Sequence, residues 1–230
     1  MAKKEDVKDI FNDIAPKYDL LNHLLSMNID KGWRKKAMNE ISEDGRNRLL
    51  DVACGTGDFA IAASKTGVRH ITGIDISANM VEVGKQKIHE LGLEDRIVLQ
   101  SGDSEQIDFP DNTFDTVTVA FGVRNFEHLE LGLSEMCRVL RPGGKVIILE
   151  FSMPEHFPMK QLYKFYFWHI LPFIGGLVSG NREAYLYLPK SVMKFPYGDR
   201  FLKILSSCGF REVRQRRLTF GVASLYVGVK

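Results

Sequence analysis

The sequence has few cysteines, and they are too widely spaced to act together. Cys54, Cys137 and Cys208 are the only three in 230 residues, and no CxxC pair occurs. An odd and dispersed set argues against both a disulfide framework and a zinc site. We therefore expect no metal centre.

A strong charge of one sign is also lacking. The 31 lysine and arginine residues nearly balance 29 acidic residues, which leaves a net charge of +2. This balance gives no bulk attraction to nucleic acid, so we expect no nucleic-acid partner. The first residues, MAKKEDVKD, carry mixed charge and lack the apolar core of a secretory signal. The cytoplasm is the expected location.

No hydrophobic run is long enough to cross a membrane. The longest apolar stretch, residues 165–178, is interrupted by His169 and Pro172, and a spanning helix needs about 20 apolar residues. The stretch suits a buried helix or a helix at a membrane interface. Aromatic residues beside Lys160 and Lys164 fit the second alternative, a peripheral contact with the inner face of a membrane.

What the chain does contain is a regular alternation of strand and helix patterns. Residues 1–45 have helical spacing, with one helix near 31–41. Strands are then expected at 48–53, 70–75, 96–100, 114–120, 145–151, 211–218 and 223–229, with helices at 57–65, 77–91, 129–140 and 199–208. The pattern predicts a single α/β domain, 1–230, with a doubly wound, mostly parallel sheet of seven strands.

Two segments depart from this alternation. Residues 1–45 are expected to form a helical lid. Residues 152–196 are aromatic and apolar with several prolines, and we expect an insertion that covers the ligand edge of the sheet. Pro142, Gly143 and Gly144 predict a turn before the strand at 145–151.

A glycine-rich turn follows the first predicted strand. Gly55, Gly57 and Ala60 fit the pattern GxGxxG/A, in which glycines let the backbone approach a ligand closely. The pattern serves a nicotinamide dinucleotide and an adenosyl amino acid equally well. It therefore leaves an NAD(P)-dependent oxidoreductase as an alternative.

Three acids narrow the choice of cofactor. Asp51, Asp75 and Asp103 each follow or end a predicted strand, where doubly wound sheets bind ligands. A single aspartate there is usually a turn former or helix cap. Asp51 would repel a pyrophosphate but suits the cationic ammonium and sulfonium of S-adenosylmethionine. Asp75 can accept from both ribose hydroxyls, and Asp103, with Ser104 beside it, from the adenine amino group.

The segments DVACGTGD, GIDIS and RVLRPGGKVIILEF resemble those of class I methyltransferases, which have a Rossmann-like fold. More narrowly, the chain is similar to the ubiquinone/menaquinone biosynthesis C-methyltransferase family. Residues 18–26 with Trp33, residues 121–125 (FGVRN) and residues 138–151 carry this likeness, which extends over nearly the whole chain. Two positions depart from the family pattern: Asp30 stands in place of a histidine, and Ala120 in place of a frequent serine.

The resemblance implies S-adenosylmethionine as cofactor and a prenylated quinol as substrate. The quinol would be demethylmenaquinol, giving menaquinol, or the benzoquinol precursor of ubiquinone. A non-catalytic adenosyl-binding protein is a further alternative. The resemblance implies that Thr56, Asp75, Asp103 and Ser104 bind the cofactor. The complete predicted cofactor site is Asp51, Gly55, Thr56, Gly57, Asp75, Asp103 and Ser104.

Methylation of a quinol carbon requires stabilisation of a quinolate and removal of a proton. Arg124 is the first candidate for stabilisation, Asn125 for substrate binding, His128 for a base, and Tyr18 for a lid residue that reaches the site. Structural roles compete with each assignment, for example a pair between Arg124 and a carboxylate such as Glu127. The aromatic stretch 162–171 would hold the isoprenoid tail or form ordinary core. The sequence leaves open whether the chain forms oligomers.

Overall fold

A computed structural model of the chain describes residues 3–19, 26, 28–170 and 182–230, without the side chains of residues 17 and 182–186. Residues 20–25 and 27 of the expected helical lid lie outside the described residues, as does the apolar run from residue 171 to 178.

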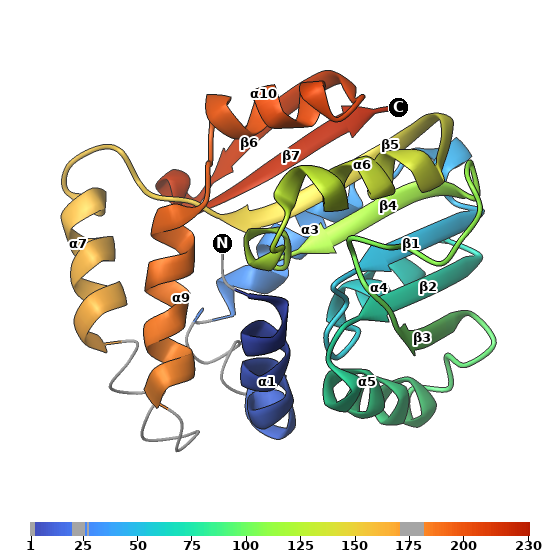
Figure 1. Cartoon of the computed structure of the whole chain (residues 1–230), viewed down its shortest axis with the longest axis horizontal. Helices are drawn as coiled ribbons and strands as arrows, with labels where there is room; N and C mark the ends of the chain where they lie inside the picture. Colours follow the sequence, from blue (N-terminus) through green and yellow to red (C-terminus); the bar gives the residue numbers. More distant parts are fainter. Residues whose placement is uncertain (1–2, 20–25, 27, 171–181) are drawn as a thin grey trace.

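Seven strands form a single sheet in the order β3-β2-β1-β4-β5-β7-β6. The strands are β1 Arg48–Val52, β2 His70–Asp75, β3 Ile97–Ser101, β4 Phe114–Ala120, β5 Leu140–Phe151, β6 Arg211–Leu218 and β7 Ala223–Val229. Only β7 runs antiparallel to its neighbours, β5 and β6 (Figure 1). The predicted doubly wound, mostly parallel sheet is confirmed.

Helices cover both faces of the sheet. The described helices are α1 Lys4–Ile14, α3 Ile29–Met38, α4 Asp58–Ser64, α5 Ala78–Glu90, α6 Leu129–Val139, α7 Met159–Phe165, α9 Arg182–Lys194 and α10 Asp199–Ser207, with the short segments η1 Ala15–Lys17, η2 Glu43–Gly45, η3 Val123–Asn125, η4 Tyr166–Ile170 and η5 Thr219–Gly221. Helices α3, α4 and α5 lie on one face of the sheet, and α6 and α10 lie on the other. None of the described helices is long and apolar enough to span a membrane.

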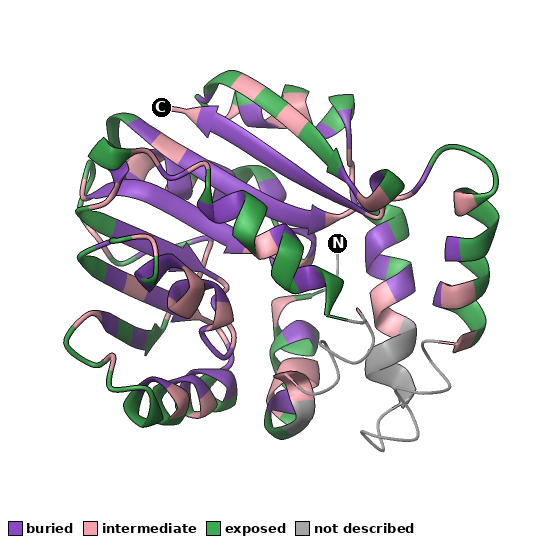
Figure 2. Cartoon of the chain, turned by 180° about the vertical axis from the view of Figure 1, so that it is seen from behind, coloured by how far each residue is buried: buried purple, intermediate pink, exposed green. Residues whose placement is uncertain are grey.

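The core consists of two apolar layers, one on each face of the sheet. Leu49 packs with α3, α4 and α5, whereas its neighbour Leu50 packs with α6 and α10. This alternation follows from the two-residue period of a strand, and both faces are buried because helices cover both. Figure 2 shows the central strands almost entirely buried.

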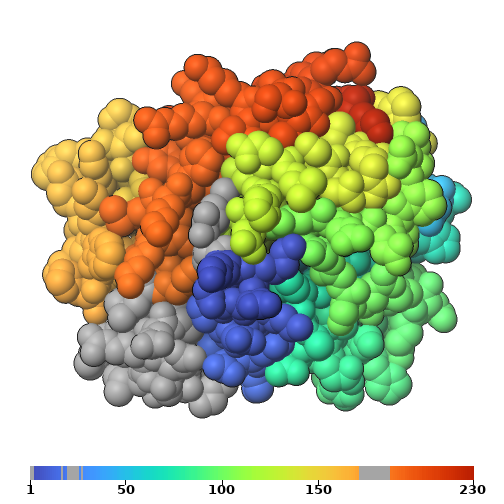
Figure 3. All heavy atoms as spheres, in the orientation of Figure 1, coloured from blue at the N-terminus to red at the C-terminus, as the bar shows by residue number. Residues whose placement is uncertain are grey.

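The N-terminal helices and the insertion pack together at the carboxyl edge of the parallel strands (Figures 1 and 3). A third apolar cluster joins them: Ile14 of the N-terminal segment packs with Tyr163, Phe167 and Val192 of the insertion. Ser77 caps α5, since its hydroxyl accepts from the Met80 N–H at 3.2 Å.

The predicted turn at Pro142–Gly144 proved to lie within a strand. The strand β5 begins at Leu140, which pairs with Phe114, and the next pair joins Lys145 to Thr116. The residues between bulge out of register, and Gly143 has a φ of +78° that accommodates the bulge. The sequence showed the glycines but not that Leu140 pairs before them.

Gly84 allows α5 to approach the turn after β1 closely. A Cβ at Gly84 would lie 2.5 Å from Leu99 Cδ1 and 3.1 Å from the backbone carbon of Thr56. Gly32, in the interior of α3, has no atom within 4 Å of the same position. The two glycines are both helical, but only Gly84 lies against a neighbouring element, so substitutions at the two positions can be compared directly.

We predict that Gly32→Ala stabilises the protein by about 0.5–1 kcal/mol, because alanine restricts the unfolded chain and favours the helix. Gly84→Ala should instead destabilise it by about 1–3 kcal/mol through overpacking against the backbone of the turn. Urea denaturation of both variants measures the difference. Equal stabilisation by the two substitutions would contradict the close approach.

Candidate active site

Three cavities meet at the carboxyl edge of the sheet, and Tyr18 and Phe121 line all three. Cavity A lies along the ends of β2 and β3, the small cavity B lies at the turn after β1, and cavity C lies between α3, the N-terminal helix and α9. They contain about 680, 350 and 660 Å³ of space, in part open to solvent.

The cavities lie where the strand order reverses, between β1 and β4. Ala53 and Phe121, which follow these two strands, adopt left-handed φ angles of 51° and 58°. Such conformations are unfavourable for residues with side chains and concentrate at functional sites. The two loops touch, since a Cβ at Gly122 would lie 2.6 Å from the Ala53 Cβ.

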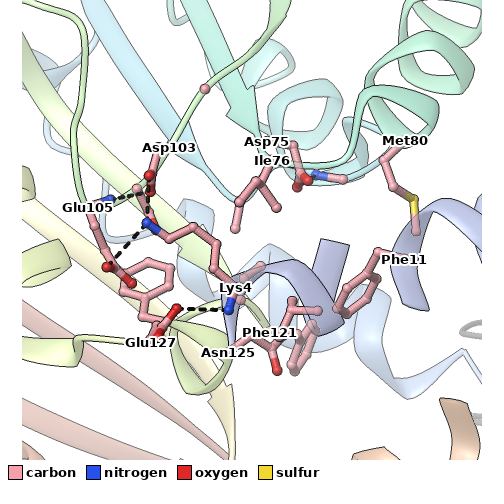
Figure 4. Close-up of a pocket in the computed structure, with 18 of the residues that line it drawn as sticks. Lys4, Phe11, Asp75, Ile76, Met80, Asp103, Glu105, Phe121, Asn125 and Glu127 are labelled. Atoms are coloured by element: carbon pink, nitrogen blue, oxygen red, sulfur yellow. Dashed lines mark hydrogen bonds and ion pairs between the residues drawn. The ribbon is translucent and has the colours of Figure 1, made fainter. Parts of the chain in front are cut away.

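Asp75 supplies the acid at the end of β2 in cavity A (Figure 4). Its Oδ2 accepts from the Gly55 N–H at 2.8 Å and its Oδ1 from the Ser77 N–H at 2.9 Å. Burial raises the pKa of this carboxyl, and the two N–H groups oppose the rise. Each oxygen can accept a second hydrogen bond, so the carboxylate is able to hold a pair of ligand hydroxyls.

Asp103 and Ser104 also line cavity A. The ammonium of Lys4 lies 2.6 Å from Asp103 Oδ2 and 3.4 Å from Glu105 Oε2. The Lys4 N–H also donates to Glu127 Oε2 at 2.9 Å. Figure 4 shows Lys4 reaching across the cavity to these acids, so the first turn of α1 closes cavity A.

Asp51 lines cavity B with Gly55 and Thr56 and is almost fully buried. Its Oδ1 accepts from the Thr118 hydroxyl at 2.8 Å, whereas its buried Oδ2 has no partner in the described part of the chain. Burial raises the pKa of Asp51 to about 7, against the opposing effects of Thr118 and the Arg34 cation. A buried carboxylate oxygen without a partner suits a cationic ligand.

Thr56 is held by the polar groups next to cavity B. Its hydroxyl donates to Asp19 Oδ1 at 2.5 Å and accepts from Lys87 Nζ at 3.2 Å. Lys87 also pairs with Asp58 at 2.6 Å. These contacts fix the turn after β1, and Gly57, with a φ of +80°, allows the turn to lead into α4.

Arg124 lines cavity C, and its carboxylate partner is Glu150 rather than Glu127. Its Nη1 lies 2.9 Å from Glu150 Oε1 and also donates to the Phe121 carbonyl, and its Nε donates to Ser191 Oγ at 3.3 Å. The Nη2 donates to no group of the described residues, which leaves it available to a substrate oxygen.

Of the other predicted catalytic residues, Tyr18 and Asn125 line the cavities and His128 does not. Tyr18 borders all three cavities, and Asn125 lines cavity A, where its Oδ1 accepts from the Tyr187 hydroxyl at 2.9 Å. The side chain of His128 is 67% exposed, bonds to Glu105 and lines none of the three cavities. The structure therefore does not bring the His128 side chain into any of the three cavities.

Comparison with known proteins relates this arrangement to a family. The sequence pattern of the ubiE/COQ5 methyltransferase family matches residues 1–230. The chain belongs to this family. A relative in Bacteroides fragilis, named demethylmenaquinone methyltransferase, is 45% identical over 99% of this chain and 94% of its own length. Another in Geotalea daltonii, named ubiquinone/menaquinone biosynthesis C-methyltransferase, is 47% identical over 99% and 97%.

The fold of this family member resembles those of solved proteins at lower identity. A [4+2]-cyclase named SpnF has a TM-score of 0.72 at 17% identity and covers 97% of this chain and 95% of its own. A SAM-dependent methyltransferase of Thermotoga maritima has a TM-score of 0.66 at 18% identity, covering 96% and 99%. These similarities establish the class I methyltransferase fold expected from the sequence.

Sequence reasoning missed three residues of the site in this family member. Arg34 lines cavities B and C, and Tyr187 and Asp30 line cavity C. Arg34 follows Trp33, a residue of the family likeness, but nothing in the local sequence pattern indicated that the Arg34 side chain points toward the cavities. Asp30 was noted only as a departure from that likeness. Within the described residues no cluster of His, Cys, Asp and Glu side chains could hold a metal ion.

The raised pKa of Asp51 predicts a pH dependence of cofactor binding. A cationic ligand favours the charged carboxylate, so between about pH 5 and 7 its binding displaces a proton. The affinity for S-adenosylmethionine should therefore rise with pH by up to about tenfold per unit and level off above 7. Asp51→Asn should remove this dependence. Calorimetric titration measures both, and an equal pH dependence in the two proteins would contradict the role of Asp51.

Proposed function

We propose that this protein transfers the methyl group of S-adenosylmethionine to a ring carbon of demethylmenaquinol. One observation carries the proposal: two acid-lined cavities meet a third, aromatic cavity at Tyr18 and Phe121, which line all three. The aromatic cavity is also lined by the guanidinium groups of Arg34 and Arg124. The names of the relatives support the choice of quinol.

The residues of cavities A and B fit S-adenosylmethionine. Asp75 would hold the ribose hydroxyls, Asp103 and Ser104 the adenine, and the unpartnered Oδ2 of Asp51 the cationic amino-acid end. A dinucleotide fits less well, because a pyrophosphate at the glycine turn would lie against the Asp51 carboxylate. This arrangement disfavours the nicotinamide-dependent oxidoreductase.

Cavity C fits a flat aromatic substrate with an apolar tail. Its walls include the rings of Phe121 and Phe151, whose centroids lie 4.5 Å apart, and the apolar side chains of Ile10, Ile14 and Leu188. A quinol ring on this aromatic wall would be close to cavity B, where the bound cofactor supplies a methyl group on a cationic sulfur. Holding the two reactants in line would account for most of the rate gain, ~7–11 kcal/mol.

Two side chains of cavity C have the chemistry that the reaction needs. Arg124 stabilises the negative charge that develops on the quinol oxygen. Asp30 takes the hydroxyl proton, because its side chain is the only carboxylate among the described residues that line this cavity. Ser26 donates to Asp30 Oδ1 at 2.6 Å and the Arg34 Nε to its Oδ2 at 3.3 Å, and these contacts orient the carboxylate.

The function is tested by supplying purified protein with S-adenosylmethionine and a short-chain demethylmenaquinol, kept reduced, and identifying the product by mass spectrometry. We expect a product one methyl group heavier, and none from the oxidised quinone, which lacks the hydroxyl whose proton is lost. The benzoquinol precursor of ubiquinone serves as the competing substrate. Methylation of the oxidised and reduced forms at equal rates would contradict the mechanism.

The role of Asp30 gives a separate prediction. Asp30→Asn keeps the shape of the side chain but cannot accept the proton, so kcat should fall by roughly 10²-fold or more. The loss should shrink as the pH approaches the phenol-like pKa of the quinol, about 10, where the substrate ionises without help. A pH-rate profile of variant and wild type measures this. A loss that is the same at every pH would assign Asp30 a purely structural role.

Contact with a membrane would deliver the apolar substrate. Leu162, Phe165 and Trp168 are 58%, 59% and 41% exposed on α7 and η4, beside the exposed Lys160 and Lys164. Apolar and aromatic residues flanked by lysines are typical of helices that rest on anionic bilayers.

We predict that Phe165→Ser lowers partitioning onto vesicles containing anionic phospholipid by roughly tenfold, through loss of buried apolar area. The control is Leu91→Ser, which alters a side chain that is 54% exposed at the end of α5. Co-sedimentation compares the two. Equal binding of both variants and wild type would place membrane contact elsewhere.

A further inference from the structure

Arg34 has a charge that the cofactor site described above does not use. It is the only basic residue among the described residues that line cavity B, and its side chain is 12% exposed. The same cavity contains the unpartnered carboxylate oxygen of Asp51. Two carboxylates, Asp51 and Asp58, and one cation therefore line cavity B, and Asp58 already pairs with Lys87 at 2.6 Å, which leaves Asp51 and Arg34 to face a ligand.

This pair of charges matches a free amino-acid end. An α-amino acid carries an ammonium and a carboxylate on a single carbon, and each requires a partner of opposite charge when it is removed from water. The glycine turn at Gly55 supplies backbone but no further cation. A carboxylate in cavity B would therefore have Arg34 as its cationic partner.

We propose that Arg34 binds the α-carboxylate of the cofactor's methionyl group, opposite the ammonium at Asp51. The proposal rests on the proposed use of S-adenosylmethionine. A guanidinium presents donors in a planar fork and suits a carboxylate better than a point charge does.

The present contacts of Arg34 leave room for this role. Its Nε donates to Asp30 at 3.3 Å, and its Nη2 lies 3.6 Å from Asp58 Oδ2, beyond hydrogen-bond distance. Asp58 has a much closer cation in Lys87, at 2.6 Å. The Arg34 guanidinium also lies 5.9 Å from the centre of the Phe121 ring, which keeps it at the junction of the cavities.

Arg34 also joins the two reactants, because it lines cavity C as well as cavity B. A carboxylate anchored there fixes one end of the methionyl chain, and the pairing of Arg34 with Asp30 sets that end relative to the proton acceptor in cavity C. The same side chain thereby determines how the methyl group faces the quinol.

The test compares binding of S-adenosylmethionine with binding of its decarboxylated form, which keeps the sulfonium and the amine but lacks the carboxylate. Calorimetric titration is carried out on wild type, Arg34→Gln and Arg34→Lys. Wild type should bind S-adenosylmethionine at least tenfold more tightly than the decarboxylated form. Arg34→Gln should lose this preference by weakening only the carboxylated ligand, and Arg34→Lys should recover part of it.

Arg141→Gln is the matched control, since it also removes a guanidinium that pairs with an aspartate, Asp115 at 2.9 Å, but from a residue that lines none of the three cavities. It should leave the ratio of the two affinities unchanged. Equal weakening of both ligands by Arg34→Gln would show that Arg34 only maintains the local structure and would overturn the proposal. Failure of wild type to bind either ligand would instead contradict the proposed function, and with it this inference.

Discussion

The buried ion pair between Arg124 and Glu150 is the interaction on which the geometry of the site depends. Glu150 is fully buried at the end of β5 and accepts from the Arg124 guanidinium and from the N–H groups of Arg124 and Phe151. Removing one partner of such a pair typically costs about 3–5 kcal/mol, because a charge remains buried without compensation. The pair fixes the loop after β4, and that loop places Phe121 between the three cavities.

The helices that close the site depend on one another. The end of α1, the π-helical turn η4 and α9 meet in a single apolar cluster, and Tyr18 and Phe11 of the N-terminal segment each border two or more cavities. The walls that would enclose the cofactor and those that would enclose the acceptor thus belong to the same packed unit. Lys4, held by acids of cavity A, fixes the start of this unit.

Charge is divided across the site in a way that suits the proposed chemistry. Asp51, Asp75 and Asp103 line the cofactor side, Arg124 lines the acceptor side, and Arg34 lies where the two sides meet. A cationic methyl donor is favoured on the first side and a developing quinolate on the second. Partial burial makes both effects stronger than they would be in open water.

The sequence by itself determined the sheet and the acids at its edge. Sequence periodicity and the turn glycines predicted six of the seven strands to within one residue at either end. Asp51, Asp75 and Asp103 were predicted to lie at the ligand edge of the sheet because each stands at or just after the end of a strand. Tertiary structure alone decided which side chains share a cavity. It paired Arg124 with Glu150 instead of Glu127, kept His128 away and brought in Arg34 and Asp30. Such contacts join residues far apart in the chain, and local patterns carry no information about the direction of a long side chain across a packed interface.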